Sequence, residues 1–369
     1  MDTEKNNANS ASEVVCPEGN NVVGDSKKDG LPDFVNLAKS LKNPPALPSE
    51  LIEGILLCGH KMLISGASKT GKSFLLMELC IAISEGLSWL GFSCKKGRVL
   101  YINLEIDESS AVKRFSDIYK ALGIRCQHAN DITVWNLRGH AMKLDQLVPE
   151  IISRARDQHY DAIIIDPIYK VITGDENNAT EMSHFCNLFD KLCADLGCAV
   201  IYCHHHSKGA QGAKRAIDRP SGSGVYARDP DALLDLVELT LSNDLKTALG
   251  SDDATAFRLE ASLREFPRIK PRNLWYKYPT HRIDDSGILD DAYAEGSPVA
   301  NFSKSPKYTT PNQRKASVNA AYAACRTDNQ PVTVAAMAAH MGVSERCARD
   351  RIKECNGEFE VKSGFVFKS

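Results

Sequence analysis

The chain has 369 residues, of which 43% are hydrophobic and 25% charged, so it can bury a sizeable core and form two or three structural units. Its formal net charge is only −2, which excludes an overall basic field as the basis of nucleic-acid binding and directs attention to local patches. The 12 cysteines are scattered without a CxxC pair, and no apolar run approaches the ~20 residues of a membrane span. We therefore expect reduced thiols, a cytoplasmic location and no membrane partner.

Residues 1–30 are rich in Asn, Ser, Asp and Glu and contain few large apolar side chains, which predicts a disordered tail. Residues 31–290 alternate short β-branched runs with longer helical patterns. Such alternation predicts the α/β class, with a mostly parallel sheet flanked by helices. The predicted strands contain KMLISG, RVLYINLE, ITVWNL, DAIIIDP and CAVIYCHH. The predicted helices run from Lys72 to Glu85, from about Ser109 to Leu122, through Ile151, and from Glu181 to Leu196.

Three strand-like segments end this region and are not separated by long helical patterns. We expect them to extend the sheet as antiparallel strands at one edge. Their sequences are ALLDLVELTLS, ATAFRLEASLRE and NLWYKYPTHRI. Residues 291–314 contain prolines and serines and few apolar side chains, which is typical of a linker. Residues 315–369 are predicted to form a small second domain.

The segment GASKTGKS, residues 66–73, satisfies the pattern GxxxxGK[ST] between a predicted strand and a predicted helix. In such a loop, backbone N–H groups and the helix N-terminus hold the phosphates of a nucleotide. We expect Lys72 to neutralise charge near the γ-phosphate and Ser73 to offer its hydroxyl to Mg²⁺, so ATP and Mg²⁺ are the predicted cofactors. Lys69 either touches a phosphate or faces solvent. The predicted cofactor-binding residues are Gly66, Ala67, Ser68, Lys69, Thr70, Gly71, Lys72, Ser73 and Phe74.

Two carboxylates follow predicted strands and are candidates for the chemistry of hydrolysis. Asp166 ends the apolar run AIII and is the predicted Walker B residue, which would complete the metal site with Ser73. Many motors carry a glutamate directly after this aspartate, whereas Pro167 stands here. Glu105, which ends RVLYINLE, is therefore the predicted group that activates water, on a strand expected beside that of the phosphate loop. A strand-end turn for Asp166 and a surface position for Glu105 are the alternatives.

Three histidines, His204, His205 and His206, lie at the end of the predicted strand CAVIYCHH. A polar side chain at this position can sense the γ-phosphate or relay its loss to the following loop. A metal site is the rival interpretation. Adjacent residues of an extended strand point alternately to opposite faces, so these histidines converge on one ion only if the strand bends. We therefore expect one sensor histidine.

The order of these motifs resembles that of a known ATPase family. GASKTGKS, YINLEID, AIIIDP, GCAVIYCHHHSKG and SGSG follow one another as in the RecA-fold ATPases of the plasmid RepA type, which are hexameric replicative helicases related to the DnaB group. The resemblance covers roughly residues 45–275. It implies a RecA-like P-loop NTPase core, and ATP hydrolysis at the subunit interfaces of a homo-oligomeric, hexameric ring that moves along single-stranded DNA. It also implies catalytic roles for Lys72 and Glu105, a metal role for Asp166 and a sensor role for His205.

Members of this family carry an arginine shortly after the small-residue element, and its side chain reaches the ATP of the neighbouring subunit. Here the region reads RPSGSGVYARDPDALLDL. Arg219 and Arg228 both lie near the expected position, and neither falls squarely on it. Arg219 is the candidate for this catalytic role, and Arg228 is the alternative.

Residues 207–224 are predicted to form a glycine-rich loop after the histidines, which we call the basic loop. This prediction does not depend on the family resemblance. The basic side chains of the loop outnumber its one acid, Asp218, which suits contact with a DNA backbone, here single-stranded. A solvated basic loop is the alternative. The predicted DNA-binding residues of the loop are Lys208, Lys214 and Arg215.

The C-terminal segment has the spacing of a helix-turn-helix unit. Helices are predicted at 317–326 and Thr333–His340, and a third, N-capped by Ser344, follows a turn at Gly342 and continues to about Glu354. FEVKSGFVFK then indicates two short strands. The segment therefore resembles a winged helix-turn-helix domain.

The third of these helices carries a basic face. Arg346, Arg349 and Lys353 are spaced so that they share this face, while Ala348 and Ile352 can pack inward. The three bases are predicted to bind duplex DNA. Because no residue here specifies a base sequence, a protein–protein module is the alternative.

These features favour an ATP-driven DNA motor or helicase loader, in which hydrolysis moves the basic loop. Service to the replication of a plasmid, phage or similar mobile element follows from the resemblance alone. An ATP-dependent regulatory or recombination-type DNA-binding protein shares every motif and differs in lacking strand displacement. A small-molecule kinase would explain the phosphate loop and leave the basic loop and the C-terminal segment without a role.

Overall fold

The computed structural model describes most of the chain in detail. The described residues are 33–140, 142–172, 176–207, 209, 211–222, 224–242, 245–246, 253–290, 292–294, 297, 311–326, 331–341, 343–355 and 357–368. The predicted tail, the predicted DNA-binding residue Lys208 and the predicted turn residue Gly342 lie outside these described residues.

The chain divides into two units, Met1–Leu47 and Pro48–Ser369. In the described part of the first unit there is one short helix, α1 (Leu37–Lys42), whose N-terminus is capped by the side chain of Asn36. The sheet and the candidate site belong to the second unit.

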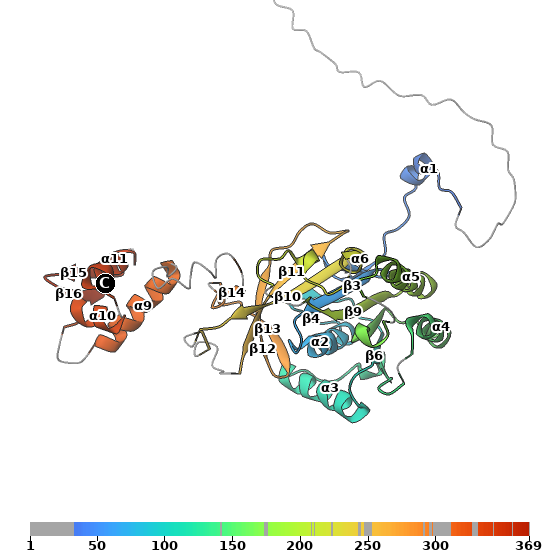
Figure 1. Cartoon of the computed structure of the whole chain (residues 1–369), viewed down its shortest axis with the longest axis horizontal. Coiled ribbons are helices and arrows are strands. Elements are labelled where there is room, and N and C mark those ends of the chain that lie inside the picture. Colours follow the sequence, from blue (N-terminus) through green and yellow to red (C-terminus); the bar gives the residue numbers. More distant parts are fainter. Residues whose placement is uncertain are drawn as a thin grey trace, which may run out of the picture. The chain divides into compact units, whose positions relative to one another are not determined.

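A sheet with ten strands in the described residues forms the centre of the second unit. Its strands are β3 (Lys61–Gly66), β6 (Val99–Asn103), β7 (Ile132–Asn136), β8 (Ala162–Asp166), β9 (Ala199–His205), β10 (Ala232–Thr240), β11 (Thr255–Leu263), β12 (Arg272–Lys277), β13 (Thr280–Ile283) and β14 (Tyr293–Ala294). They lie in the order β13-β12-β11-β10-β3-β9-β8-β6-β7, with β14 also paired to β10 (Figure 1). Neighbouring strands from β10 to β7 are parallel, whereas β11 to β14 pair antiparallel. This arrangement confirms the predicted α/β class.

Helices cover both faces of the parallel strands (Figure 1). They are α2 (Lys72–Glu85), α3 (Glu108–Leu122), α4 (Leu144–Ala155), α5 (Ala179–Leu196) and α6 (Gly224–Arg228). Met62 and Ile64 of β3 belong to the core beneath α2 and α3, while Leu63 belongs to the core beneath α4, α5 and α6. Successive side chains of a strand point to opposite faces, so one apolar run supplies both cores. No helix in the described ranges has both the length and the hydrophobicity that crossing a bilayer requires.

The local sequence explains where these helices begin and end. The Asp107 carboxylate accepts a hydrogen bond from the Ser110 amide at 2.9 Å and so caps α3. Asn178 caps α5 in the same way through the Thr180 amide at 3.0 Å. Gly86 ends α2 with a φ of 69°, a left-handed conformation that glycine adopts at little cost. Short strands and turns complete this region: β1 (Glu50–Ile52), β2 (Leu56–Leu57), β4 (Ser88–Trp89), β5 (Phe92–Ser93), and the 3₁₀ turns Ala129–Asp131, Ile168–Lys170 and Ala216–Asp218.

Two expectations about the sheet are wrong. The segment ALLDLVELTLS, which is β10, pairs parallel to β3, because a loop and α6 carry the chain back across the sheet after β9. The strand that precedes Glu105, β6, is not the neighbour of β3, because β9 and β8 lie between them. The segment NLWYKYPTHRI divides into β12 and β13, which form an antiparallel hairpin.

The C-terminal segment contains three helices and a hairpin in its described residues. These are α9 (Pro311–Cys325), α10 (Val334–His340), α11 (Glu345–Lys353), β15 (Phe359–Lys362) and β16 (Phe365–Lys368). Val318, Met337, Ile352 and Val366 contribute to a separate hydrophobic core. The Ser344 hydroxyl accepts from the Cys347 amide at 3.3 Å, which confirms the predicted cap of α11.

The range predicted as a linker, 291–314, includes structured residues. Tyr293 and Ala294 form β14, Ala292 packs into a small core with Leu289, and α9 already begins at Pro311. Most of the intervening residues lie outside the described part of the chain.

Candidate nucleotide site

The phosphate loop joins the end of β3 to the start of α2, at the edge of the sheet where the parallel strands end. Gly71 has a φ of 78° and lies against His281, whose ring atoms would be 3.2 Å from an added Cβ. Both the backbone conformation and the close approach therefore require glycine. The Thr70 hydroxyl donates to the Ala67 carbonyl at 2.8 Å and stabilises the turn.

The Lys72 amine is held inside the loop. It donates to the carbonyls of Gly66 at 3.0 Å and Ala67 at 2.6 Å, and the residue is only 8% exposed. Burial lowers the pKa of this amine, and the nearby carboxylates of Asp166 and Glu105 oppose that shift. The site therefore concentrates one buried cation and two carboxylates around the phosphate loop.

The other predicted cofactor-binding residues take three different positions. Ser68 and Lys69 are exposed on the loop, and Ser73 is half-buried in the first turn of α2. Phe74 follows, and the guanidinium carbon of Arg114 lies 4.7 Å from the centre of its ring. Lys69 has a φ of 64°, so the loop has left-handed backbone on both sides of Thr70.

Asp166, at the end of β8, is 3% exposed and is fixed by two neutral donors. Its Oδ2 accepts from the Tyr101 hydroxyl, and its Oδ1 accepts from the Cys203 thiol at 3.0 Å. Burial raises the pKa of both Tyr101 and Cys203 well above their usual ranges, so both groups remain protonated donors. Neither donor carries a charge, and the carboxylate keeps its attraction for a cation.

Glu105 is an exposed residue just after β6, and its charge acts on Lys72 although two strands separate β6 from β3. The Tyr169 hydroxyl donates to Glu105 Oε1 at 3.2 Å, and the Tyr169 ring packs on His205 with ring centres 4.9 Å apart. Burial and the Glu105 carboxylate raise the pKa of Tyr169 to about 12, which keeps its hydroxyl a donor. Sequence reasoning did not find Tyr169; the available signal was its position three residues after Asp166, at the same sheet edge.

The three histidines point to different surroundings. His204 packs on the ring of Tyr226, and His206 Nε2 lies 2.7 Å from an oxygen of Asp235. His205 lies between them; burial and then the Lys72 ammonium lower its pKa, and its buried Nδ1 has no partner in the described residues. In the described ranges, no group of three His, Cys, Asp or Glu side chains is arranged to hold a metal ion.

Asp235 of β10 is fully buried and joins the phosphate-loop strand to the loop that follows the histidines. One oxygen, Oδ1, accepts from the Ser65 hydroxyl and contacts His206, while Oδ2 accepts from Arg219 at 2.6 Å. Arg219 also donates to Glu260 at 2.6 Å. Sequence reasoning missed this group, whose signal was an aspartate inside the apolar run ALLDLV.

The surroundings of Arg219 differ from those expected of a group that reaches a neighbouring subunit. Besides the two carboxylates, its guanidinium donates to the carbonyls of Gln211 at 3.0 Å and Lys214 at 2.6 Å, and the residue is 4% exposed. Arg219 thus fastens the loop to its own chain. Of the two arginines considered from the sequence, Arg228 is the exposed one.

Two other bases of the loop, Lys214 and Arg215, lie closer to its surface than Arg219. The Lys214 amine donates to the Ser207 hydroxyl at 2.8 Å. Arg215 has a side chain that is 83% exposed and pairs with Asp218 at 3.0 Å. Both arrangements leave charge at the surface, as contact with a polyanion requires.

The predicted basic face of α11 is present. Arg346, Arg349 and Lys353 are exposed, whereas Ile352 is buried in the core of the C-terminal segment. Arg349 pairs with Glu345 one turn away, at 3.1 Å.

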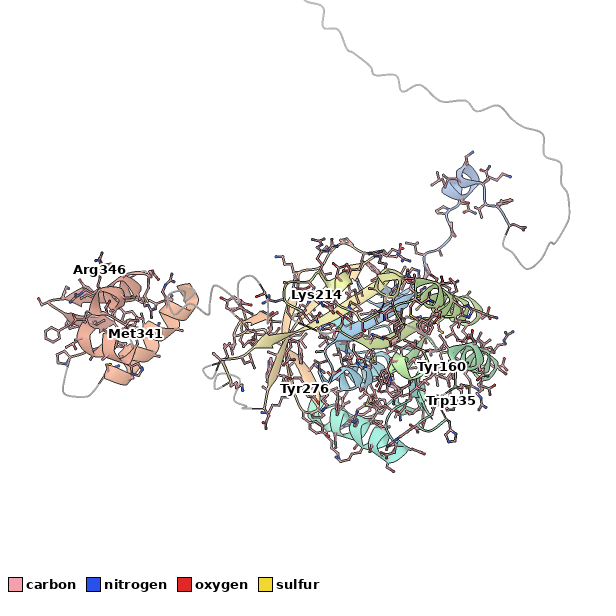
Figure 2. All side chains as sticks on the ribbon, viewed as in Figure 1. Trp135, Tyr160, Lys214, Tyr276, Met341 and Arg346 are labelled. Carbon is pink, nitrogen blue, oxygen red and sulfur yellow. The ribbon has the colours of Figure 1, made fainter. Side chains whose placement is uncertain are left out.

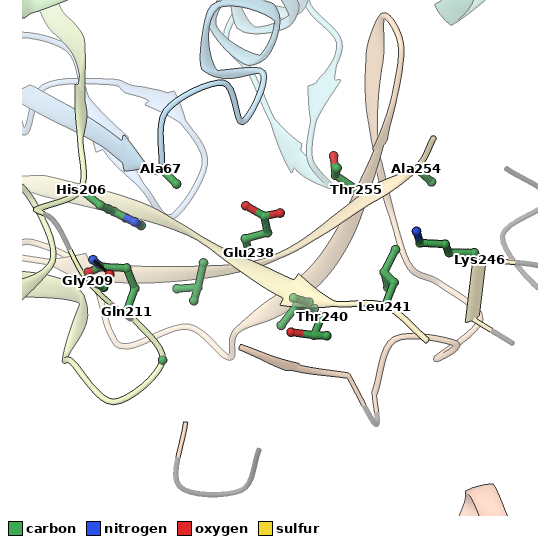
Figure 3. A pocket seen from close by; sticks show the side chains of 13 residues that line it. Ala67, His206, Gly209, Gln211, Glu238, Thr240, Leu241, Lys246, Ala254 and Thr255 are labelled. Atoms are coloured by element: carbon green, nitrogen blue, oxygen red, sulfur yellow. Dashed lines mark hydrogen bonds between the residues drawn. The ribbon is translucent and has the colours of Figure 1, made fainter. Parts of the chain in front are cut away.

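A pocket of about 440 Å³ adjoins the phosphate loop at Ala67. In Figure 3, Ala67 and His206 lie at one end of this pocket, and Leu241 and Lys246 lie at the other. The pocket runs along the end of β10, beside the loop that carries Gln211.

Comparison with known proteins agrees with this geometry. Residues 30–211 match a family model described as an AAA domain. The matched range contains the phosphate loop, Glu105, Asp166 and His205, and it supports an ATPase of the P-loop type. The mostly parallel sheet flanked by helices is that of a RecA-like P-loop core. No curated protein matches the chain.

Replacing Asp235 by alanine is expected to destabilise the fold by about 3–5 kcal/mol, because Arg219 and His206 would remain buried without their carboxylate. Urea unfolding followed by tryptophan fluorescence measures the change. Asp195→Ala removes an exposed carboxylate from α5 and should change stability by less than about 0.5 kcal/mol. If the two substitutions changed the free energy of unfolding equally, Asp235 would not have the stabilising role assigned to it.

Proposed function

We propose that the protein is an ATP-hydrolysing, DNA-binding motor, a RepA-like replicative helicase or helicase loader of a plasmid, phage or mobile element. The observation that carries the proposal is the buried Lys72 ammonium, which is bonded to the phosphate loop and is acted on by the charges of Asp166 and Glu105. The sheet edge that holds these groups also leads, through the histidines, into the basic loop. The RepA-like assignment rests on the resemblance of the motifs.

The side chains fit Mg²⁺-ATP. Mg²⁺ prefers oxygen ligands and is usually held by one or two carboxylates together with substrate phosphates. Ser73 and Asp166 would supply the protein oxygens, and the ion would draw negative charge from the β- and γ-phosphates. Lys72 would exchange its loop carbonyls for a phosphate, which is a stronger partner for an ammonium.

Glu105 would orient and deprotonate the attacking water, with its carboxylate held by Tyr169. His205 is proposed as the sensor, since its buried Nδ1 has no partner in the described residues and its ring packs on Tyr169. A neutral imidazole in this position can form a hydrogen bond when the γ-phosphate is present and lose it after release.

The link to DNA is proposed to run through Asp235. Ser65 immediately precedes the phosphate loop, and the same carboxylate that binds Ser65 also binds Arg219. Arg219 holds the carbonyls of the basic loop, so a shift at the phosphate loop would be passed on by bonded groups. Contact of Lys214 and Arg215 with single-stranded DNA would then depend on the nucleotide.

A homo-oligomeric ring, hexameric as the family resemblance implies, belongs to this proposal. Arg228 is the arginine that would complete a neighbour's ATP site, because it is exposed while Arg219 is bonded within its own chain. An ATP-dependent regulatory or recombination-type protein is the second candidate, favoured by the exposed basic face of α11 in a segment that resembles a winged helix. Strand displacement separates the two functions, because unwinding needs repeated turnover while regulation needs only binding.

ATP turnover is expected to rise when single-stranded DNA is added. Lys72→Ala should abolish nucleotide binding and turnover, while Glu105→Gln should retain binding and lower turnover by about 10²- to 10⁴-fold, as expected for loss of a general base. Glu53→Gln, an exposed glutamate near β1, is the control and should leave the rate unchanged. A chain that cleaves no ATP with any nucleic acid, or full activity of Glu105→Gln, would contradict the proposal.

Tyr169→Phe is expected to lower kcat by about 10- to 150-fold with little change in KM for ATP, since a hydrogen bond to a charged group contributes roughly 1.5–3 kcal/mol. The ring that packs on His205 is retained. Steady-state kinetics measures both constants. Tyr160→Phe removes a comparable hydroxyl contact, 3.0 Å to Thr133, away from the site and should have no effect on kcat. Equal kcat values for the two variants would show that Tyr169 does not orient Glu105.

The triple variant Arg346→Ala, Arg349→Ala, Lys353→Ala is expected to weaken binding of duplex DNA. The slope of log K against log salt concentration should fall by about 0.9 for each phosphate that the variant no longer neutralises. Fluorescence anisotropy of a labelled DNA duplex, titrated with the full chain at several salt concentrations, measures both the affinity and the slope. The control removes three exposed bases of the α/β core, in α3, directly after α4 and in α5: Lys120, Arg156 and Lys191. Unchanged duplex binding by the first variant would favour a protein–protein role for this segment.

A further inference from the structure

We propose that a groove between the basic loop and the connection from β11 to β12 binds the backbone of single-stranded nucleic acid. The inference rests on the proposed DNA-binding function and deepens it, because it assigns the connection, residues 264–271, as a second wall of the site. The sequence of this connection is REFPRIKP.

The groove has a volume of about 710 Å³ and is lined by two segments far apart in the chain. Lys214 and Arg215 come from the basic loop, and Arg268 comes from the connection. Figure 2 marks the position of Lys214 on the α/β core. Cations from both segments therefore face one open space.

The charge of the groove is strongly unbalanced. Its lining contains four cationic side chains and one anionic side chain, Glu260. That carboxylate is already bonded to Arg219 at 2.6 Å, and Arg219 in turn is buried. The remaining charge at the surface is positive, so the groove attracts polyanions.

The connection adds bases that its own chain does not neutralise. Arg268 and Lys270 are exposed, and in the described part of the chain neither makes a side-chain hydrogen bond or ion pair. Arg264, in contrast, pairs with Asp231 at 2.8 Å. One exposed acid, Glu265, lies in the same connection, and Asp218 is paired with Arg215. Exposed bases that outnumber the acids of the same segment gain from contact with an anionic ligand.

The floor of the groove is fixed before any ligand binds. Arg219 binds the loop carbonyls of Gln211 and Lys214 and the carboxylates of Asp235 and Glu260. On the other wall, the side chain of Ile269 packs against the main hydrophobic core. The two walls are therefore held at a set separation, which reduces the entropy cost of binding.

The chemistry of the lining favours a nucleic-acid backbone over bases. The uncharged side chains that line the groove are aliphatic or small, and none in the described lining is aromatic, so there is no surface on which bases stack. Spaced cations suit repeated phosphates and carry no sequence information. We assign a single strand because the site is a groove between two segments, whereas duplex readers insert a helix or ribbon into the DNA.

The test removes two cations of the connection in the full-length chain, as Arg268→Ala with Lys270→Ala. With a labelled oligothymidylate, anisotropy should give an affinity about tenfold weaker at ~0.1 M salt. The salt slope should fall by about 0.7 for each phosphate that is no longer neutralised, the value for single strands. The matched control is Arg156→Ala with Lys191→Ala, which removes two exposed bases from elsewhere on the core. ATP turnover without DNA should equal that of the unmodified chain in both.

Each outcome decides the proposal. If both double variants bind the oligonucleotide like the unmodified chain, the groove is not the site, and the DNA-binding function stands. If the unmodified chain hydrolyses ATP but binds no single strand at low salt, both proposals fail together. If the first double variant loses duplex binding and keeps single-strand binding, the assigned ligand is wrong. The double reversal Arg268→Glu with Lys270→Glu should deepen the loss, and circular dichroism confirms that each variant is folded.

Discussion

Four parallel strands, β3, β9, β8 and β6, end at one edge of the sheet, and the candidate site depends on this common edge. The phosphate loop, His205, Asp166 and Glu105 each lie at or just after the end of one of these strands. Parallel pairing in matched register brings the four segments together although they are far apart in the chain. Helices pack on both faces of the strands, so the edge is held by two hydrophobic cores rather than by the loops themselves.

Two buried carboxylates near this edge, Asp166 and Asp235, suit different functions because their hydrogen-bond partners differ in charge. Asp166 is held by a hydroxyl and a thiol, which fix its position and leave its negative charge for a cation. Asp235 is held by the guanidinium of Arg219, which compensates its charge inside the protein. The first arrangement suits a metal ligand, and the second suits a structural joint between β3, β10 and the basic loop.

The hydrogen bonds of Asp235 connect the phosphate loop with the basic loop, so a shift of one can be transmitted to the other. A change in nucleotide state acts first on the phosphate loop, which begins beside Ser65, and the bonds from Ser65 through Asp235 to Arg219 end on the loop carbonyls. The floor of the proposed groove contains the same guanidinium. Nucleotide and nucleic acid would therefore bias one bonded network, which is the condition for reciprocal coupling between two sites.

Features that depend on neighbouring residues were predictable from the chain's residue order. The eight residues GASKTGKS after an apolar run predict a phosphate loop, since glycine conformation and the helix start are local properties. The apolar runs before Asp166 and Glu105 likewise predict buried strands that end in carboxylates. Which strands of the sheet are neighbours was decided by tertiary packing alone. The strand β10 pairs parallel with β3, and β6 is separated from β3 by β9 and β8. Arg219 is buried because Asp235, 16 residues further along the chain, comes to lie beside it. Strand order and charge burial depend on contacts between distant segments, whose free energies no local pattern contains.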